Sequence, residues 1–279
     1  MTYKTIIVCF TNEETAKRLT LAAAAMARKF DAHLIGIHTR QSFTMFPGAM
    51  PYSTVEISQA FEESQREISA RIEKIFREHT RVEEFVSEWR SVVSLFTDIG
   101  KRLAEDARCA DLVIIGQPAQ GDQDETGMFE RELIEACGRP VLVIPHSGEF
   151  EEIGNNPLIA WSTTREATRA VHDALPFLQK AEKTTLFWVE KARSQPSLYA
   201  DTGHEMAAAL DRQGIKVTVG RQIRTDIPIG DEILNEAARL GSDLLIAGAY
   251  GHTRVYDFLI GATTPHLMRH MTVPVLLSG

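Results

Sequence analysis

Apolar residues along this chain follow two patterns, short continuous runs and longer stretches with helical spacing. Continuous runs of apolar residues occur at Ile6–Phe10, Leu112–Ile115 and Val141–Ile144. Such runs are typical of strands buried on both faces of a parallel sheet, where every side chain meets a covering helix. They are far too short to cross a bilayer as helices.

Stretches with helical spacing separate these runs. The first predicted helix follows Asn12, which can cap it, and its counterpart in the second half follows Thr163 or Thr164. A long amphipathic helix is predicted over residues 54–79, with a shorter counterpart near His204–Gln213. Their apolar faces comprise Leu19, Ala22 or Ala23, Met26 and Phe30 in the first helix, Leu175 and Leu178 in its counterpart, and Ile57, Phe61, Ile68, Ile72 and Ile75 in the long helix.

The order of elements occurs twice along the chain. Asp111 opens the run Asp-Leu-Val-Ile-Ile-Gly, and Asp243 opens the run Asp-Leu-Leu-Ile-Ala-Gly. Each half also closes on a similar Pro-Val-Leu segment, at Pro140 and at Pro274. A period of about 140 residues is too long for a solenoid and indicates two copies of one domain.

Strands that alternate with helices predict an α/β fold. We expect two tandem copies of an open, doubly wound, Rossmann-like domain with a five-stranded, mostly parallel sheet. The predicted domains are residues 1–147 and 155–279, joined by the polar stretch around Ser147–Pro157. In sheets of this kind ligands bind outside the carboxyl ends of the strands.

Composition narrows the range of partners. The chain has 279 residues, a formal net charge of −8 and three cysteines. Nucleic acid and anionic membranes require a basic surface, so neither is expected as a partner. The cysteines are scattered without a CxxC pair, which predicts neither disulfides nor a zinc site. The beginning of the chain lacks the features of a signal peptide, and a cytoplasmic location is therefore expected.

One glycine-containing stretch carries candidate chemistry. Gly248 ends a predicted strand, Gly251 follows in the loop, and Gly261 comes shortly before a predicted helix. Glycine lets a backbone approach a ligand closely, and the free N–H groups at a helix start attract anions. Thr264 is predicted to cap this helix, with Pro265 as its first residue. The stretch therefore predicts a phosphate site.

Other signatures of nucleotide or acyl chemistry are missing from the sequence. Neither first strand is followed by a GxGxxG fingerprint, and no GxSxG motif occurs. Gly116 and Gly121 have the spacing of a P-loop, but the lysine that would hold phosphate is absent.

The first half serves as an internal comparison for the glycine stretch. Alignment back from Pro140 and Pro274 places Glu130 opposite Thr264, and Gln117 opposite Gly251. A carboxylate at a helix start satisfies the helix dipole internally and repels phosphate. An anion site is therefore predicted in the second half and not in the first.

These residues resemble the universal stress protein family in its tandem two-domain form. The nucleotide motif of that family is Gly-x₂-Gly-x₉-Gly-Ser/Thr, and Gly248, Gly251 and Gly261 stand at this spacing. The resemblance implies a cytoplasmic protein that supports survival under stress. It also implies adenine nucleotide binding, as in some members: ATP, ADP or AMP, with or without Mg²⁺. The closing strands Val141–Ile144 and Val275–Leu277 would lie at sheet edges, and we expect them to pair in an internal pseudo-dimer, with a homodimer as a further option.

Two positions depart from the family pattern. Ala262 replaces the Ser or Thr after the third glycine, although Thr263 and Thr264 follow it. The strand-tip Asp of the family's nucleotide binders is also missing, and Ser162 is the candidate to hydrogen-bond a ribose or base there. Arg254 is expected to hold phosphate through its guanidinium, with a plain loop residue as the alternative.

Three further features have open interpretations. His266 and His270 lie four residues apart on the predicted helix, which suits a metal, but no third ligand is near in sequence, and a solvent-facing pair is the alternative. His252, in the glycine loop, is a weaker phosphate candidate than Arg254. The stretch Phe43–Tyr52 is either a lid over an apolar ligand or a crossover loop packed on the core.

Three classes of function remain open from the sequence. The leading hypothesis is a regulatory module that binds an adenine nucleotide in its second half. A slow ATPase or nucleotidyl transferase is the second, although the glycine stretch has no recognisable general base, and Asp257 is the only acid in its loop. An interaction protein without a ligand is the third.

Overall fold

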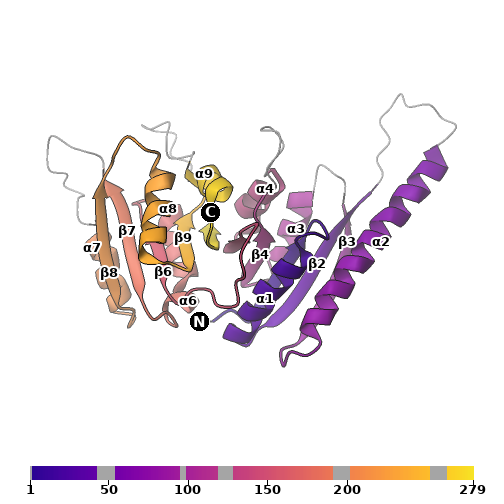
Figure 1. The fold of residues 1–279 in the computed structure, drawn as a ribbon, viewed down its shortest axis with the longest axis horizontal. Coiled ribbons are helices and arrows are strands. Elements are labelled where there is room, and N and C mark those ends of the chain that lie inside the picture. Colours follow the sequence, from indigo (N-terminus) through magenta and orange to yellow (C-terminus); the bar gives the residue numbers. More distant parts are fainter. Residues whose placement is uncertain (1, 43–53, 95–98, 119–127, 191–201, 252–262) are drawn as a thin grey trace.

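The computed structural model describes residues 2–42, 54–94, 99–118, 128–190, 202–251 and 263–279 (Figure 1). The elements of the first half are β1 (Thr5–Phe10), α1 (Ala16–Phe30), β2 (His33–Gln41), α2 (Thr54–Thr80), β3 (Ser87–Ser94), α3 (Ile99–Ala107), β4 (Leu112–Gly116), α4 (Met128–Cys137) and β5 (Val141–Ile144). Those of the second half are β6 (Pro157–Ala160), α5 (Arg165–Asp173), α6 (Leu175–Leu178), β7 (Thr184–Glu190), α7 (Thr202–Asp211), β8 (Val217–Ile223), α8 (Ile229–Leu240), β9 (Leu244–Gly248), α9 (Thr263–His270) and β10 (Val275–Ser278).

The described strands form one ten-stranded sheet in the order β3-β2-β1-β4-β5-β10-β9-β6-β7-β8. Neighbouring strands within each half are parallel, and β5 pairs with β10 antiparallel at the centre. Each half thus repeats one five-stranded topology, in which the first strand lies between the second and the fourth. The predicted fold class, a mostly parallel α/β sheet in two tandem copies, is confirmed.

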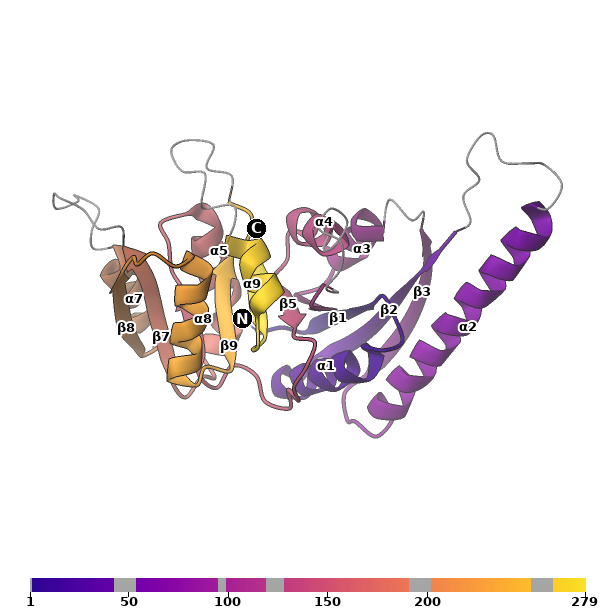
Figure 2. The same cartoon turned by 45° about the horizontal axis from the view of Figure 1, so that its top comes forward.

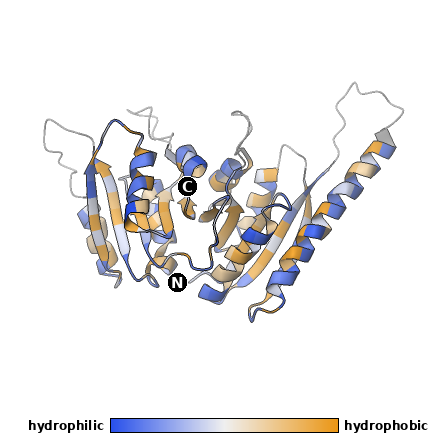
Figure 3. Cartoon of the chain, viewed as in Figure 1, coloured by the Kyte–Doolittle hydropathy of each residue, from blue (hydrophilic) through white to orange (hydrophobic). Residues whose placement is uncertain are grey.

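Helices cover both faces of this sheet, as the continuous apolar runs predict (Figure 2). The side chains of α1, α2, α5, α6 and α7 pack in one core with alternate strand residues such as Ile6 and Leu276. Those of α3, α4, α8 and α9 pack in a second core with the intervening residues, such as Ile7 and Leu277. Figure 3 shows apolar strands between helices whose outer faces are hydrophilic. In the described part of the chain, no helix is long and apolar enough to span a membrane.

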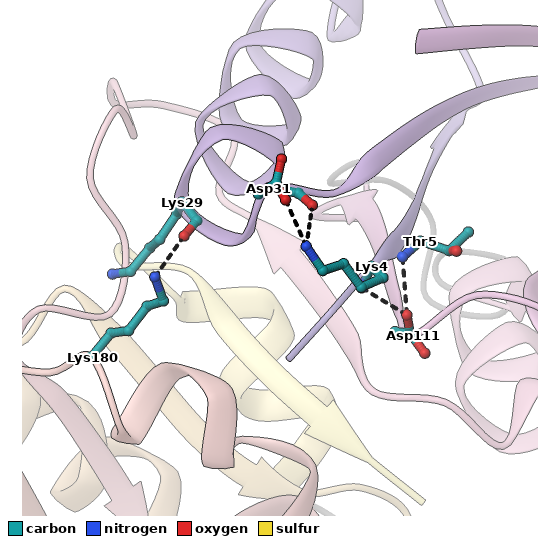
Figure 4. Close-up of polar contacts among 6 residues, drawn as sticks. All are labelled: Lys4, Thr5, Lys29, Asp31, Asp111 and Lys180. Carbon is teal, nitrogen blue, oxygen red and sulfur yellow. Dashed lines mark hydrogen bonds and ion pairs between the residues drawn. The ribbon is translucent and has the colours of Figure 1, made fainter. Parts of the chain in front are cut away.

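The repeated aspartates have the same structural task in both halves. Asp111 precedes β4, and its carboxylate accepts hydrogen bonds from the backbone N–H groups of Lys4 and Thr5 at 2.8 and 2.9 Å (Figure 4). Asp243 precedes β9 and accepts from the N–H groups of Asn155 and Asn156 at 2.7 and 2.8 Å. Each aspartate therefore ties the beginning of the fourth strand to that of the first.

Contacts at the base of the molecule join the halves beside the β5–β10 pair. Lys180 Nζ donates to the carbonyl of Lys29 at 2.9 Å (Figure 4), and Lys29 Nζ donates to the Ile153 carbonyl at 2.6 Å. Phe30 of α1 meets Phe177 of α6 edge to face, with ring centroids 5.1 Å apart. The halves therefore share an apolar contact bordered by two lysines.

The first helix of each half differs in detail from its prediction. α1 begins at Ala16, because Asn12 Oδ1 accepts from the backbone N and hydroxyl of Thr15 and so stabilises a turn before the helix. In the second half the corresponding helix is interrupted: α5 ends at Asp173, and α6 with Leu175 and Leu178 is a separate turn containing Pro176. The cap of α5 is Thr164, one of the two predicted candidates.

The long helix α2 covers Thr54–Thr80, close to the predicted 54–79. Its apolar face is buried only toward its carboxyl end, where Ile72 and Phe76 enter the core. Ile57 remains 51% exposed. Figures 1 and 2 show the amino-terminal part of α2 running beyond the sheet, which explains this difference.

Candidate functional site

The candidate site lies at the carboxyl ends of β6 and β9. These strands are parallel neighbours, while β7 lies on the other side of β6 and β10 on the other side of β9. The chain therefore leaves the two strands toward opposite sides, which is the switch point where doubly wound sheets bind ligands. The loop after β6 carries Ser162, and the loop after β9 carries the glycine motif.

Gly248 is required by close packing of the fold. A Cβ at this position would lie 2.5 Å from the backbone N of Ala167 and 2.6 Å from the carbonyl carbon of Glu166. The first turn of α5 thus rests directly on the end of β9. At the equivalent Gly116 of the first half, a Cβ would meet only the Leu19 side chain, at 3.7 Å or more. The role that the structure gives Gly248 is helix packing.

Gly251 faces a carboxylate. A Cβ on this residue would lie 2.9 Å from Glu166 Oε2. Glu166 is only 8% exposed, and its other oxygen, Oε1, accepts a hydrogen bond from Nε of the exposed Arg165 at 3.1 Å and forms an ion pair with Nη2 of the same guanidinium at 3.0 Å. The surroundings of the glycine loop therefore include an acid that the sequence does not place there.

Tyr250 connects the glycine loop to α9. It adopts a left-handed backbone conformation with a φ of 48°, and its N–H donates to Thr264 Oγ1 at 3.3 Å. The helix begins at Thr263, so Thr264 lies within its first turn, and the predicted N-cap role of Thr264 and first position of Pro265 are wrong. The hydroxyl of Thr264, a residue only 4% exposed, instead holds the loop against the helix.

Ser162 lies at the same edge of the sheet. It is exposed, and its Oγ is 3.1 Å from Thr164 Oγ1, which also accepts from the Ala167 N–H as the α5 cap. Ser162, Gly248, Gly251, Thr263 and Thr264 are thus brought to the edge formed by two adjacent loops and the helix starts beside them.

The histidine pair of α9 has a partner from another helix. His266 Nε2 lies 2.7 Å from Asp231 Oδ1 in the first turn of α8, and the His266 ring packs against Gly230. The His270 ring is 4.5 Å from the His266 ring. Among the described residues, no three His, Cys, Asp or Glu side chains are grouped to hold a metal ion. In the structure, His266 links α9 to α8 through Asp231.

Comparison with known proteins identifies the family. The model of the universal stress protein family matches residues 2–145 and again residues 158–278. This chain belongs to the universal stress protein family. It carries the family's domain twice in tandem.

Individual relatives are distant. The universal stress protein Slr1230 of Synechocystis is 25% identical over 60% of this chain, and the match spans 57% of that relative's length. A universal stress protein structure from Archaeoglobus fulgidus covers 98% of this chain and 95% of its own, with a TM-score of 0.67 and 15% identity, which supports the fold. Another from that organism, solved in complex with dAMP, covers 51% of this chain and 98% of its own, with a TM-score of 0.33 and 18% identity.

Several predicted site residues of this universal stress protein lie outside the described part of the chain. They are Arg254, Gly261 and Ala262, together with His252 and the stretch Phe43–Tyr52. Their predicted roles remain predictions.

Glu130 carries less negative charge near neutral pH than the alignment of the two halves assumes. It lies in the first turn of α4, as predicted, but burial raises the pKa of its carboxyl group from the usual 4.5 to about 7, although its own backbone N–H lowers it. The side chain is therefore a partly protonated acid near neutral pH. The phosphate-repelling charge assigned to this position is weaker than the sequence suggests.

Sequence reasoning missed Glu166 and Asp231. Each lies in the first turn of a helix whose start is at the same sheet edge. Acidic residues in a first turn are common because they interact favourably with the helix dipole, so the pattern itself carried no signal for a site. Parallel topology places both turns beside the glycine loop and α9.

Proposed function

We propose that this tandem universal stress protein is a regulatory module that binds an adenine nucleotide in its second half. The ligand class is ATP, ADP or AMP, with or without Mg²⁺. The observation that carries the proposal is the family spacing of Gly248, Gly251 and Gly261, with its first two glycines beside the β6–β9 switch point. Phosphates are proposed to lie near the amino terminus of α9, where N–H groups without intrahelical partners attract anions.

The other residues supply polar contacts in this proposal. Thr263 and Thr264 begin α9, and Arg254, Gly261 and Ala262 precede it in the sequence. Ser162, on the neighbouring loop, is proposed to bond the ribose or base. In the first half Glu130 stands opposite Thr264, and no nucleotide is proposed there. Gln117 directly follows Gly116, as Ala249 follows Gly248, so the predicted alignment of Gln117 with Gly251 is wrong.

Binding is favoured over catalysis by the acids that the structure describes at this edge. Glu166 is engaged by Arg165, and Asp231 is engaged by His266. Each carboxylate therefore already has a side-chain partner, and neither is held as an unpaired general base. A slow ATPase and a ligand-free interaction protein remain outcomes of the test below.

The test is nucleotide binding measured by calorimetry and thermal shift with ATP, ADP, AMP and cyclic dinucleotides. A ligand that binds only the folded state raises the melting temperature. Gly261→Val is the informative variant, because Gly248 and Gly251 are packed against α5 and Glu166 and their substitution would disturb the fold. Its matched control is Gly127→Val in the first half.

We expect one nucleotide per chain, loss of binding in Gly261→Val and unchanged binding in Gly127→Val. Steady turnover of ATP at catalytic protein concentration would favour the ATPase. No shift with any nucleotide would favour the interaction protein.

We also propose that residues 1–147 and 155–279 are two domains joined as an internal pseudo-dimer, and that the protein works in the cytoplasm without nucleic acid or membrane partners. The antiparallel pairing of β5 with β10 and the net charge of −8 support this arrangement.

A further inference from the structure

A glutamine of the first half caps a helix of the second half. Gln117 follows β4 and is 7% exposed. Its Nε2 donates to the carbonyl oxygens of Met268 at 2.8 Å and Arg269 at 3.2 Å, in the last turn of α9. Its Oε1 accepts from the N–H of His146 at 2.9 Å. Carbonyls in the last turn of a helix lack intrahelical partners, so this side chain satisfies two of these groups in α9.

An arginine of the first half contacts the loop at the other end of α9. The guanidinium of Arg131, in α4, lies 5.2 Å from the centroid of the Tyr250 ring. Arg131 Nε also donates to Glu135 Oε1 at 3.0 Å, which orients the guanidinium. The Tyr250 hydroxyl is 3.6 Å from Met268 Sδ on α9. The ring of Tyr250 is therefore held between the two halves.

Tyr250 needs such support because of its backbone conformation. A left-handed conformation in a residue other than glycine is strained and persists only when surrounding contacts fix it. Arg131, Met268 and Thr264 supply these contacts, and Tyr250 directly precedes Gly251. The geometry of the glycine loop thus depends in part on a side chain from the other half.

We propose that the first half sets the ligand affinity of the second half through Gln117 and Arg131, which position α9 and Tyr250. This inference rests on the proposed nucleotide site. The two residues act as positioning residues, because they hold the elements that carry the site. Binding and interface geometry are then coupled, and by linkage a bound nucleotide stabilises the contacts of Gln117 and Arg131 in return.

The test uses the full chain with Gln117→Leu and Arg131→Met. Leucine keeps the approximate volume of Gln117 without its donors, and methionine keeps much of the Arg131 stem without the guanidinium. The matched control is Arg77→Met, since Arg77 forms an ion pair with Glu73 at the same i,i+4 spacing and similar exposure, but on α2. Arg131→Lys restores a cation over the ring.

Two measurements are made on each variant. Calorimetry gives the dissociation constant for ATP, and we expect it to rise about threefold to tenfold in both variants, to stay unchanged in Arg77→Met and to recover partly in Arg131→Lys. Hydrogen exchange without nucleotide should show faster exchange of the α9 amides and of the Tyr250 amide in Gln117→Leu and Arg131→Met only.

The two proposals fail in different ways. If the parent binds no adenine nucleotide, the proposed function fails, and hydrogen exchange still decides whether the first half positions α9. If the parent binds ATP while both variants bind it equally well, the positioning role is overturned. Unchanged exchange in α9 would overturn it as well.

Discussion

The carboxylate of Glu166 lies against Gly251, where a Cβ would approach its Oε2 to 2.9 Å. The first turn of α5 therefore brings a negative charge to the loop where a nucleotide phosphate is proposed. Part of this charge is balanced by Arg165, which is exposed and screened by solvent. The nucleotide that this site accepts has to tolerate a nearby acid.

We expect Glu166→Gln to bind metal-free ATP about threefold to tenfold more tightly than the parent, because the substitution removes a charge that repels the triphosphate. The gain should be smaller with Mg²⁺, which neutralises part of the phosphate charge. Calorimetry with and without Mg²⁺ measures both effects. Glu182→Gln is the control, since it changes the net charge equally at an exposed position before β7. Equal gains in the two variants would mean that Glu166 does not face the ligand.

Gly248 and Gly116, which end β9 and β4, are expected to differ in whether they tolerate a side chain. Gly248→Ala should lower the free energy of unfolding by about 1 to 3 kcal/mol, because its Cβ would overlap the backbone of α5 and force the helix away. Gly116→Ala should change stability little, since its Cβ would meet only the Leu19 side chain at ordinary contact distance. Urea unfolding of both variants gives the comparison. Equal stability of the two would show that α5 shifts without cost.

The raised pKa of Glu130 predicts that the free energy of unfolding depends on pH. Its folded-state pKa of about 7 exceeds the usual 4.5, so the folded state binds the proton more tightly than the unfolded state. This contribution is present below pH 4.5 and is lost as pH rises to about 7, by roughly 3 kcal/mol, at about 1.4 kcal/mol for each pKa unit.

Glu130→Gln stays neutral at every pH and removes this dependence. We therefore expect the variant to match the parent near pH 4.5 and to be more stable near pH 8. Urea unfolding across this range measures the difference. The prediction is contradicted if the stability difference between parent and variant is the same at both pH values.

The β5–β10 pair predicts how separated halves behave. In residues 1–148 expressed alone, β5 would become an open apolar edge and Phe30 would lose its contact with Phe177. Such edges pair with other chains. We expect each half to aggregate or self-associate, and residues 1–148 and 155–279 to associate when mixed. Analytical ultracentrifugation distinguishes this from two monomers that do not interact, the result that would count against an internal pseudo-dimer.

The sequence alone determined the fold class, because its signals are local or repeated. Buried strands show as continuous apolar runs, and the matching runs after Asp111 and Asp243 revealed the duplication before any contact was known. The structure gives those aspartates one task, tying the beginnings of two strands. The glycine spacing also placed the candidate site at the end of β9.

Tertiary structure decided what surrounds that site. Glu166 meets Gly251 and Asp231 meets His266 because parallel strands bring several helix starts to one edge. Gln117 reaches α9 because the halves join at β5 and β10. A residue far away in sequence therefore caps the carboxyl end of this helix. Local patterns specify which segments form helices and strands. Contacts between side chains more than 30 residues apart depend on topology and packing, which no local pattern contains.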